Sequence, residues 1–548
     1  MTQQITPSLE QSRIISHVTT SRKSLLVSAL AGSAKTTTIC LAANAMSELP
    51  SQAFPTLALA FNTRIKLELE ERLPKSVQCL TFNGLGHRAW GSFLRKKLEL
   101  HTGKCSGILT KLLAESRLQI SPDEFSSILS VTSSCKSIGY LPKIPNTPVQ
   151  FYPLHDSQCL TTLFFQEELD LTENNIFLVN EVLSRSTQQA LAGNIDFADQ
   201  VLLPTICPSV SFPKYSTIFV DEAQDLSPLN HRQLQKIGQP SSQYLIFGDP
   251  HQSIYAFRGA DCDGMETLAA LFNADRLDLT TSFRCPEAIC AEVRKHVPAI
   301  LSGNKNPGSV HTWQSWSIHA LFTNPSTAML CRNNAPLFTV AGLCLREALP
   351  IRILGRDIGN NLIKVVKKAH PLAPDNIHSA LSTYFKREMA KAAEGKLLRL
   401  REQRDCLVSL LTTMLSPTAD SLCSTIAQLF ADNSNLPTLS SGHKAKGLEW
   451  THIFHLDSFR IPARFAHTEA ELRQEENLRY VITTRAKRSI TYVNLRDLIE
   501  LEQDPCEQEQ EFVLPTALPA PVEALPQLSH ITPANENASS HPHAQNTD

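Results

Sequence analysis

The sequence has no excess of charge of one sign, no paired cysteine motif and no apolar run long enough to cross a bilayer. Lys and Arg number 51 and Asp and Glu 53, so the net charge of −2 gives no global sign of a nucleic-acid partner, and any basic track must be local. The 14 cysteines contain no Cys-x-x-Cys pair, which favours reduced thiols over disulfides or zinc. The N-terminus is polar and does not resemble a signal peptide, so we expect a cytoplasmic protein without a membrane partner.

A chain of 548 residues is too long for a single core, and three or four subdomains are expected. Short apolar runs alternate with helical periods in four stretches, which predicts an α/β fold. We expect a first α/β domain made of residues 1–90 and 201–284, and a second made of residues 285–359 and 437–500.

Three further stretches carry no chemical motif. Residues 91–200 and 360–436 contain helical periods, and we expect each stretch to be a helical insertion in one of the two domains. Residues 504–548 are rich in Pro, Ala, Gln, Asn and His with little apolar periodicity, so we expect a disordered tail.

The most informative stretch contains STIFVDEAQDLS and then YLIFGDPHQSIYAFRGA. Each begins with an apolar run that predicts a buried strand, and each strand delivers polar side chains at its C-terminal end, where open α/β sheets bind ligands. Asp221 and Glu222 suit a Mg²⁺-nucleotide, because one carboxylate can hold the metal and the next can handle a water. Gln252, after the second strand, is placed to sense a terminal phosphate.

A phosphate-binding loop is predicted upstream, between a short strand ending at Ser28 and a helix rich in Ala and Leu. Backbone N–H groups of such a loop cradle phosphates, Lys35 meets the β and γ charges, and Thr36 reaches Mg²⁺. Ala29 and Ala34 stand where the strict pattern has glycine, and a methyl group disfavours positive φ. The predicted phosphate-binding residues are Ala29, Leu30, Ala31, Gly32, Ser33, Ala34, Lys35, Thr36 and Thr37.

Taken alone, this loop is equally compatible with an ordinary strand–loop–helix turn. Because the Asp221-Glu222 pair and Gln252 follow it in the expected order, a nucleotide site is the stronger interpretation.

Three more motifs, GDPHQSIYAFRGA (248–260), LTTSFR (279–284) and HKAKGLEW (443–450), complete an ordered series. In this order the motifs resemble the UvrD/Rep-like superfamily 1 DNA helicases, and several details resemble the F-box DNA helicase branch and its bacterial or phage relatives. The resemblance spans most of residues 5–496. It implies two RecA-like P-loop domains with parallel sheets flanked by helices, each domain carrying a helical insertion.

The resemblance assigns roles in ATP hydrolysis, with Mg²⁺ held by Thr36 and Asp221. Glu222 would polarise the attacking water, and the two arginines would stabilise charge on the transferring phosphoryl group. Because Arg485 belongs to the second domain, closure of the cleft between the domains would complete the site. The catalytic set so implied is Lys35, Asp221, Glu222, Gln252, Arg284 and Arg485.

Three residues would contact the nucleoside. Gln11 matches the glutamine that binds the adenine edge, although an exposed helix amide is the alternative. Phe283 matches the aromatic residue that stacks on adenine, with a core phenylalanine as the alternative. Glu449 matches the carboxylate that contacts the ribose.

For DNA, the resemblance points to aromatic and polar residues after several strands. Stacking aromatics bind single strands without sequence preference, at about 1–3 kcal/mol per base. A core role is the alternative for any single aromatic among them. The predicted DNA contacts are Phe61, Asn62, Thr81, Phe82, Asn83, His87, Tyr255, Phe257 and His443.

The resemblance implies an ATP-dependent DNA helicase or translocase that moves 3′→5′ on single-stranded DNA and unwinds partly duplex DNA. Its expected location is the cytoplasm of a bacterial or phage-infected cell, in association with the nucleoid, and its expected processes are DNA repair and recombination. Two alternatives stay open. One is a translocase that strips recombinase filaments without unwinding, and the other is a nucleotide-gated DNA-binding module that no longer hydrolyses ATP.

Overall fold

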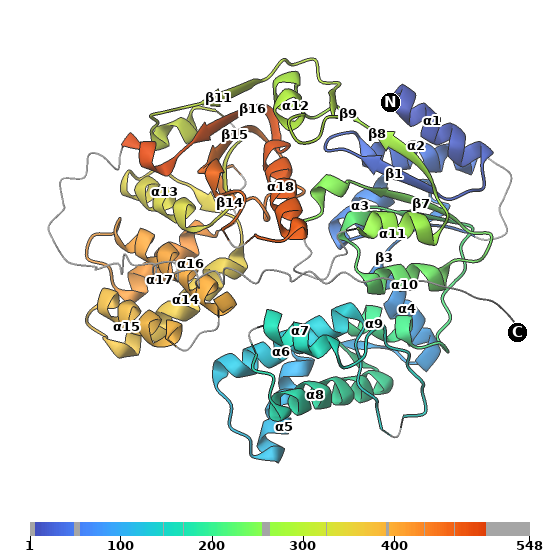
Figure 1. The fold of residues 1–548 in the computed structure, drawn as a ribbon, viewed down its shortest axis with the longest axis horizontal. Helices are drawn as coiled ribbons and strands as arrows, with labels where there is room; N and C mark the ends of the chain where they lie inside the picture. Colours follow the sequence, from blue (N-terminus) through green and yellow to red (C-terminus); the bar gives the residue numbers. More distant parts are fainter. Residues whose placement is uncertain are drawn as a thin grey trace, which may run out of the picture. The chain divides into compact units, whose positions relative to one another are not determined.

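The structure is a computed structural model, and the residues that it describes are 6–48, 55–145, 147–167, 169–254, 263–324, 326–390, 394–431, 433, 435–464 and 466–499. Two six-stranded parallel sheets flanked by helices organise this part of the chain (Figure 1), which confirms the predicted α/β class. None of its helices is long and apolar enough to cross a membrane. The tail expected to be disordered, 504–548, lies outside the described residues.

The first sheet has the strand order β3-β2-β6-β7-β1-β8, and all neighbouring strands are parallel. Successive side chains of its strands point to opposite faces, so every strand except the edge strand β8 contributes to two apolar clusters. Leu57 and Leu59, for example, face one cluster, while Ala58 and Ala60 face the other. The strands are β1 (Leu25–Ala29), β2 (Thr56–Ala60), β3 (Val77–Thr81), β6 (Thr217–Val220), β7 (Gln243–Gly248) and β8 (Asp275–Leu279).

Helices cover both faces of this sheet. Buried residues of α1 (Leu9–Thr20), α2 (Lys35–Ser47) and α3 (Thr63–Arg72) pack on one face. Those of α4 (Phe82–Leu94), α10 (Pro228–Ile237) and α11 (Gly264–Leu271) pack on the other. The sheet is therefore buried on both sides, as the continuous apolar runs predict.

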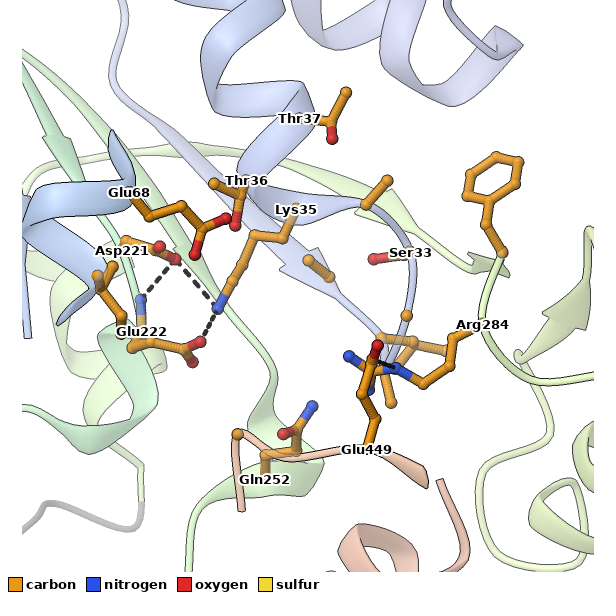
Figure 2. A pocket seen from close by; sticks show the side chains of 18 of the residues that line it. Ser33, Lys35, Thr36, Thr37, Glu68, Asp221, Glu222, Gln252, Arg284 and Glu449 are labelled. Carbon is orange, nitrogen blue, oxygen red and sulfur yellow. Dashed lines mark hydrogen bonds and ion pairs between the residues drawn. The ribbon is translucent and has the colours of Figure 1, made fainter. Parts of the chain in front are cut away.

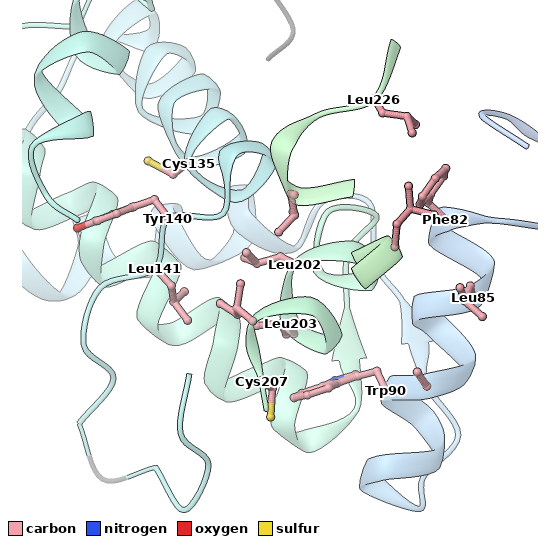
Figure 3. Close-up of a cluster of buried hydrophobic side chains, with 14 of the residues drawn as sticks. Phe82, Leu85, Trp90, Cys135, Tyr140, Leu141, Leu202, Leu203, Cys207 and Leu226 are labelled. Carbon is pink, nitrogen blue, oxygen red and sulfur yellow. The ribbon is translucent and has the colours of Figure 1, made fainter. Parts of the chain in front are cut away.

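The stretch between β3 and β6 is mainly helical, and its core is continuous with one face of the first sheet. Figure 3 shows part of this shared cluster, in which Trp90 of α4 lies near Leu203 and Cys207, and the indole N–H of Trp90 donates to the Ala190 carbonyl at 3.0 Å. The elements are α5 (Lys104–Ser116), α6 (Pro122–Ile138), α7 (Cys159–Gln166), α8 (Glu173–Ala192) and α9 (Asp199–Ile206), with β4 (Glu99–Leu100) paired to β5 (Asn194–Ile195).

The second sheet has the order β11-β16-β15-β12-β14-β13, again with parallel neighbours. Apolar runs at 328–331, 351–354, 451–456 and 490–494 predict four of its strands, which are β12, β13, β15 and β16, and the structure adds β11 and β14. The strands are β11 (Ser309–Thr312), β12 (Thr327–Cys331), β13 (Arg352–Ile353), β14 (Thr438–Ser441), β15 (Trp450–Leu456) and β16 (Ala486–Val493).

The second sheet also packs against helices through two apolar clusters. One contains buried residues of α13 and of four helices that follow it, and the other contains α12 and α18. Between the two sheets, β9 (Thr281–Ser282) pairs with β10 (Leu301–Ser302). The helices are α12 (Glu287–Val293), α13 (Ala335–Arg346), α14 (Arg356–Ala369), α15 (Ile377–Met389), α16 (Glu394–Leu411), α17 (Ala419–Leu429) and α18 (Glu469–Thr483). The division into domains and insertions at the boundaries given above stays a prediction.

Candidate nucleotide site

The loop between β1 and α2 has the backbone shape that its sequence disfavours. Ala34 lies in the left-handed region, with φ 60° and ψ 39°, directly before Lys35. A side chain in this region costs roughly 1–2 kcal/mol, so the alanine stores strain where the strict pattern has glycine. Gly32 has φ +75°, and a Cβ there would lie 2.5 Å from Arg284 Cβ and 2.6 Å from Ser282 Oγ. Glycine is therefore required at position 32, while Ala34 is tolerated at a cost.

Lys35 is held between the two carboxylates that follow β6. Its Nζ lies 3.0 Å from Asp221 Oδ1 and 2.7 Å from Glu222 Oε1 (Figure 2). Glu222 itself has φ 53°, an uncommon value for a residue with a side chain. Such backbone strain concentrates at functional sites. The structure thus joins the lysine predicted to meet phosphates to the acidic pair predicted to handle metal and water.

These three groups shift one another's pKa values. Burial lowers the pKa of Lys35, but the charges of Asp221 and Glu222 outweigh burial and raise it overall. Burial also raises the pKa of Glu222, yet the positive charges of Lys35 and Lys446 bring it down to about 2. The pKa of Asp221 is raised, because its burial and the Glu222 charge exceed the effect of Lys35. Glu222 is therefore a carboxylate at neutral pH, which suits a hydrogen-bond acceptor for water.

A cavity of about 850 Å³ surrounds this cluster, and its walls come from both halves of the chain. The whole predicted loop, both carboxylates and Gln252 line it from the first sheet. Residues after the first sheet, and residues near β15 and β16, line it from the other side. These are Phe283, Arg284, Asn304, Lys446, Gly447, Glu449, Arg485 and Lys487.

The two predicted arginines sit in different environments within this cavity. Arg284 Nε donates to Glu449 Oε2 at 2.6 Å (Figure 2), and Lys487 Nζ pairs with the other oxygen of Glu449 at 2.5 Å. Arg485 is only 1% exposed, and its Nη2 lies 3.5 Å from Gln252 Oε1. Burial and the nearby Arg284 lower the pKa of Arg485 to about 10, so it stays protonated at neutral pH. Both arginines line the cavity together with the phosphate loop and Gln252.

The three predicted nucleoside contacts are not all at the cavity. Phe283 and Glu449 line it, and the Phe283 side chain is 46% exposed, so its ring is available for stacking. Gln11 does not line it. Its amide oxygen accepts from the Ser8 N–H as part of a capping box at the start of α1, and its Nε2 donates to Thr38 Oγ1 at 3.0 Å. The alternative of an exposed amide does not fit, because Gln11 is 3% exposed, and the adenine contact stays a prediction.

The predicted DNA contacts divide into exposed, capping and buried residues. Phe61 is 42% exposed at the end of β2, whereas Phe82 is 4% exposed and belongs to the apolar cluster of the first sheet. The expectation that Phe82 stacks on a base is therefore wrong for this structure. Its ring packs in the core because α4 begins at Phe82 and turns it towards the sheet. Tyr255 and Phe257 lie outside the described residues.

Four polar residues predicted to contact DNA have hydrogen-bond partners within the protein. Asn62 and Thr81 cap α3 and α4, and Asn62 also lines the nucleotide cavity. Asn83 Nδ2 donates to the Phe197 carbonyl at 2.8 Å, and His87 Nδ1 lies 3.1 Å from Gln200 Nε2. His443 is half-buried after β14.

Sequence reasoning missed Phe197, whose side chain is 56% exposed beside Asn83. Asp196 and Asp199, on either side of it, have a structural role, because they pair with the buried amines of Lys136 and Lys104. Phe197 lies between them in the sequence and is exposed to solvent. A single aromatic residue flanked by two acidic residues was the available signal in the sequence.

Lys446 was also missed, although it lies within a motif used for the resemblance. Its Nζ bonds both oxygens of Asp225 at 2.7 Å and the Gln252 carbonyl at 2.6 Å. Its side chain is 8% exposed. The lysine thus ties the segment after β14 to the first sheet at the predicted phosphate sensor.

Among the described residues, no group of three or more His, Cys, Asp or Glu side chains is arranged to hold a metal ion alone. A metal at Thr36 and Asp221 would therefore need phosphate oxygens and water as further ligands, which is how Mg²⁺ is bound in many nucleotide sites. A strained phosphate loop, an acidic pair at a strand end and two arginines around one cavity define a P-loop nucleotide-binding protein.

Comparison with known families agrees with this class. Residues 9–273 match the UvrD/REP helicase N-terminal domain. The chain is 25% identical over 524 residues to F-box DNA helicase 1 of Gallus gallus, covering 88% of this chain and 48% of that protein. It is 25% identical over 480 residues to F-box DNA helicase protein 1 of Schizosaccharomyces pombe, covering 79% and 52%.

A shorter match, 23% identical over 245 residues, relates it to DNA helicase II of Haemophilus influenzae, covering 42% of this chain and 32% of that protein. These matches relate the chain to the UvrD-like superfamily 1 helicases. It spans about half the length of the two F-box helicases that it matches. Both of those are eukaryotic, and a bacterial or phage origin stays a prediction.

Proposed function

We propose that the protein is an ATP-dependent DNA helicase or translocase that moves 3′→5′ on single-stranded DNA and unwinds partly duplex DNA. The observation that carries the proposal is the position of Arg485. This arginine precedes β16 of the second sheet, yet it lies beside Gln252 in the cavity that contains the phosphate loop. A nucleotide in this cavity would touch both sheets, so its hydrolysis would change how they contact each other.

The cavity fits a nucleoside triphosphate in size and charge. Its volume of about 850 Å³ falls in the usual range for small-molecule sites, and seven Lys or Arg residues line it against four Asp or Glu residues. Lys35, now paired with carboxylates, would turn to the β and γ phosphates. Arg284 and Arg485 would stabilise charge on the transferring phosphoryl group.

Thr36 and Asp221 would hold Mg²⁺, which supplies positive charge to the phosphate oxygens. When Lys35 turns to the phosphates, the Glu222 carboxylate would lose the ion pair that it makes with Lys35 at 2.7 Å. Its oxygens could then accept a hydrogen bond from a water. Binding of the substrate would thereby prepare Glu222 to polarise the attacking water, with Gln252 orienting it from the opposite side.

For DNA, we propose contacts by Phe61, Asn83 and His87, which follow β2 and β3 at the same end of the first sheet as the phosphate loop. An exposed aromatic ring binds a base regardless of sequence. If each sheet grips the strand in turn as the cavity closes and opens, one cycle of hydrolysis moves the protein along the strand.

The test is strand displacement on duplexes with a 3′ or a 5′ single-stranded tail, beside ATP turnover with and without single-stranded DNA. We expect unwinding of the 3′-tailed duplex and turnover stimulated by DNA. Preference for the 5′ tail would contradict the polarity. Stimulated turnover and filament removal without displacement would identify the non-unwinding translocase. Nucleotide-dependent DNA binding without turnover would identify the binding module instead.

A further inference from the structure

A tyrosine of α18, the helix that packs on the second sheet, is hydrogen-bonded directly to the phosphate loop. The Tyr480 hydroxyl, on α18, accepts from the backbone N–H of Ala31 at 2.7 Å and donates to Asp249 Oδ2 at 3.0 Å. Ala31 lies in the loop between β1 and α2, and Asp249 follows β7. Tyr480 is 4% exposed, so both bonds lie in a dry environment where they are strong.

Asp249 in turn sets the orientation of Gln252. The Gln252 Nε2 donates to Asp249 Oδ2 at 2.7 Å, which leaves Oε1 directed to Arg485 Nη2. An amide can be reversed by a rotation of its last torsion, so the partner of its nitrogen decides which atom faces the cavity. The carboxylate of Asp249, and with it the Tyr480 hydroxyl, therefore fixes the face that Gln252 presents.

The same face of α18 holds the rest of this segment. Asn477, one turn before Tyr480, donates from Nδ2 to the Ser253 carbonyl at 2.9 Å and to the Pro250 carbonyl at 3.3 Å. Leu30 and Ala31 of the phosphate loop belong to the apolar cluster that also contains Tyr480 and its helix neighbours. The loop, the segment 249–253 and α18 are thus in contact at one place, through polar bonds and apolar packing together.

We propose that Tyr480 is a positioning residue that couples the phosphate loop to Gln252 across the two sheets. Its hydroxyl joins the loop backbone to Asp249, so Gln252 is held in its working orientation only while α18 is docked on the loop. Movement of α18 as the cavity opens would break both bonds and release the Gln252 amide. This inference rests on the proposed ATP hydrolysis, and it gives the second sheet a part in the reaction beyond its arginine.

The test is Tyr480→Phe, which keeps the ring and removes the hydroxyl. A hydrogen bond to a charged group is worth enough that kcat for ATP hydrolysis should fall about tenfold or more, while KM changes by less than about twofold. Tyr215→Phe is the matched control, because Tyr215 is equally buried and its hydroxyl bonds Gln78 away from the cavity. A role in stability alone would lower the melting temperature of both variants and leave both kcat values unchanged.

A second variant and a second readout keep the outcomes separate. Asp249→Asn should lower kcat by a similar factor, and the double variant should lose little more than either single variant. In hydrogen exchange, the Ala31 amide should become less protected in Tyr480→Phe while amides of β1 stay unchanged. Turnover in Tyr480→Phe equal to the parent, or an equal loss in Tyr215→Phe, would overturn the inference. A parent protein without ATP turnover would instead overturn the proposed function.

Discussion

The two sheets have the same size and the same parallel arrangement, but they bring different chemistry to the shared cavity. The first supplies the phosphate loop, the acidic pair and Gln252, which are groups that bind and orient. The second supplies Arg485, Glu449 and Lys446, which reach across to groups of the first. The first sheet therefore supplies most of the groups proposed to bind the phosphates, whereas the second sheet adds the proposed ribose contact Glu449 and the proposed catalytic Arg485.

The difference also appears in how the key side chains are held. Among the described residues, the Lys35 amine pairs with Asp221 and Glu222, and the oxygens of a bound phosphate could take the place of both carboxylates. Arg485 is anchored by its own sheet, through bonds to the Val481 and Leu448 carbonyls. Lys35 can therefore exchange its carboxylate partners for phosphate oxygens, whereas Arg485 is fixed to its own sheet. Arg485 would reach the phosphates only when the second sheet lies against the first.

The largest loss of ATP turnover is expected from removing the lysine of the phosphate loop. Lys35→Ala should lower ATP turnover by roughly 10³-fold or more, because no other side chain replaces its charge at the phosphates. It should also lower the melting temperature, since two buried carboxylates lose their shared cation. Lys23→Ala is the control, because Lys23 is exposed and pairs only with Asp275. Turnover at the parent rate in Lys35→Ala would show that the site is misassigned.

Removing the arginine of the second sheet should lower ATP turnover without lowering ATP affinity. Arg485→Ala should lower kcat by roughly 10²–10³-fold, because the transition-state charge loses one donor. Affinity for a fluorescent ATP analogue should change by less than about threefold. The neighbouring Arg488, which is exposed and outside the cavity, provides the control variant Arg488→Ala. Loss of nucleotide affinity with kcat retained would reverse the roles assigned to the two sheets.

A smaller change is expected from relaxing the phosphate loop of the first sheet. Ala34 has φ 60° in this structure, so the strain of roughly 1–2 kcal/mol belongs to the folded protein itself, and Ala34→Gly should raise the melting temperature while ATP affinity changes by less than about twofold. Ala29→Gly provides the contrast. Ala29 ends β1 without a positive φ, and a glycine there should cost about 0.5–1 kcal/mol of stability. A melting temperature of Ala34→Gly equal to or below that of the parent would show that the loop carries no such strain.

The last prediction concerns how stability depends on pH at the Lys446–Asp225 contact, which joins the segments of the two sheets. Burial, opposed by Lys446, raises the pKa of Asp225 to about 6, from about 3.9 in an unfolded chain. The folded protein then binds the proton more tightly, so this group's contribution to stability is largest below about pH 4, declines up to about pH 6 and is flat above. Asp225→Asn should remove that decline from a plot of melting temperature against pH. An unchanged slope would contradict the assignment.

Much of the first sheet's chemistry was predictable because it is encoded locally. The loop of Ala34 and Lys35, and the acidic pair after β6, follow apolar runs and need no distant partner to be noticed. Gln11 and Phe82 show the limit of local patterns. One is used by the capping box of α1 and the other is turned into the core, and both outcomes depend on how α1 and α4 pack.

Residues that act between the sheets were harder to find. Lys446 stands in the motif HKAKGLEW and Tyr480 lies five residues before Arg485, but their partners are more than 190 positions away in the chain. No spacing in the sequence indicates that a hydroxyl on α18 meets a loop near the N-terminus. The strands β11 (SVHT) and β14 (TLSS) were missed because each contains a single apolar residue and so gives no apolar run to detect.

The most direct test of a triphosphate shared by the two sheets is a double-mutant cycle between Gln252→Ala and Arg485→Ala, read as kcat for ATP hydrolysis with saturating single-stranded DNA. The account predicts that the double variant loses far less than the product of the two single losses, because the residues act together on one phosphoryl group. Losses that multiply, as for independent sites, would contradict it.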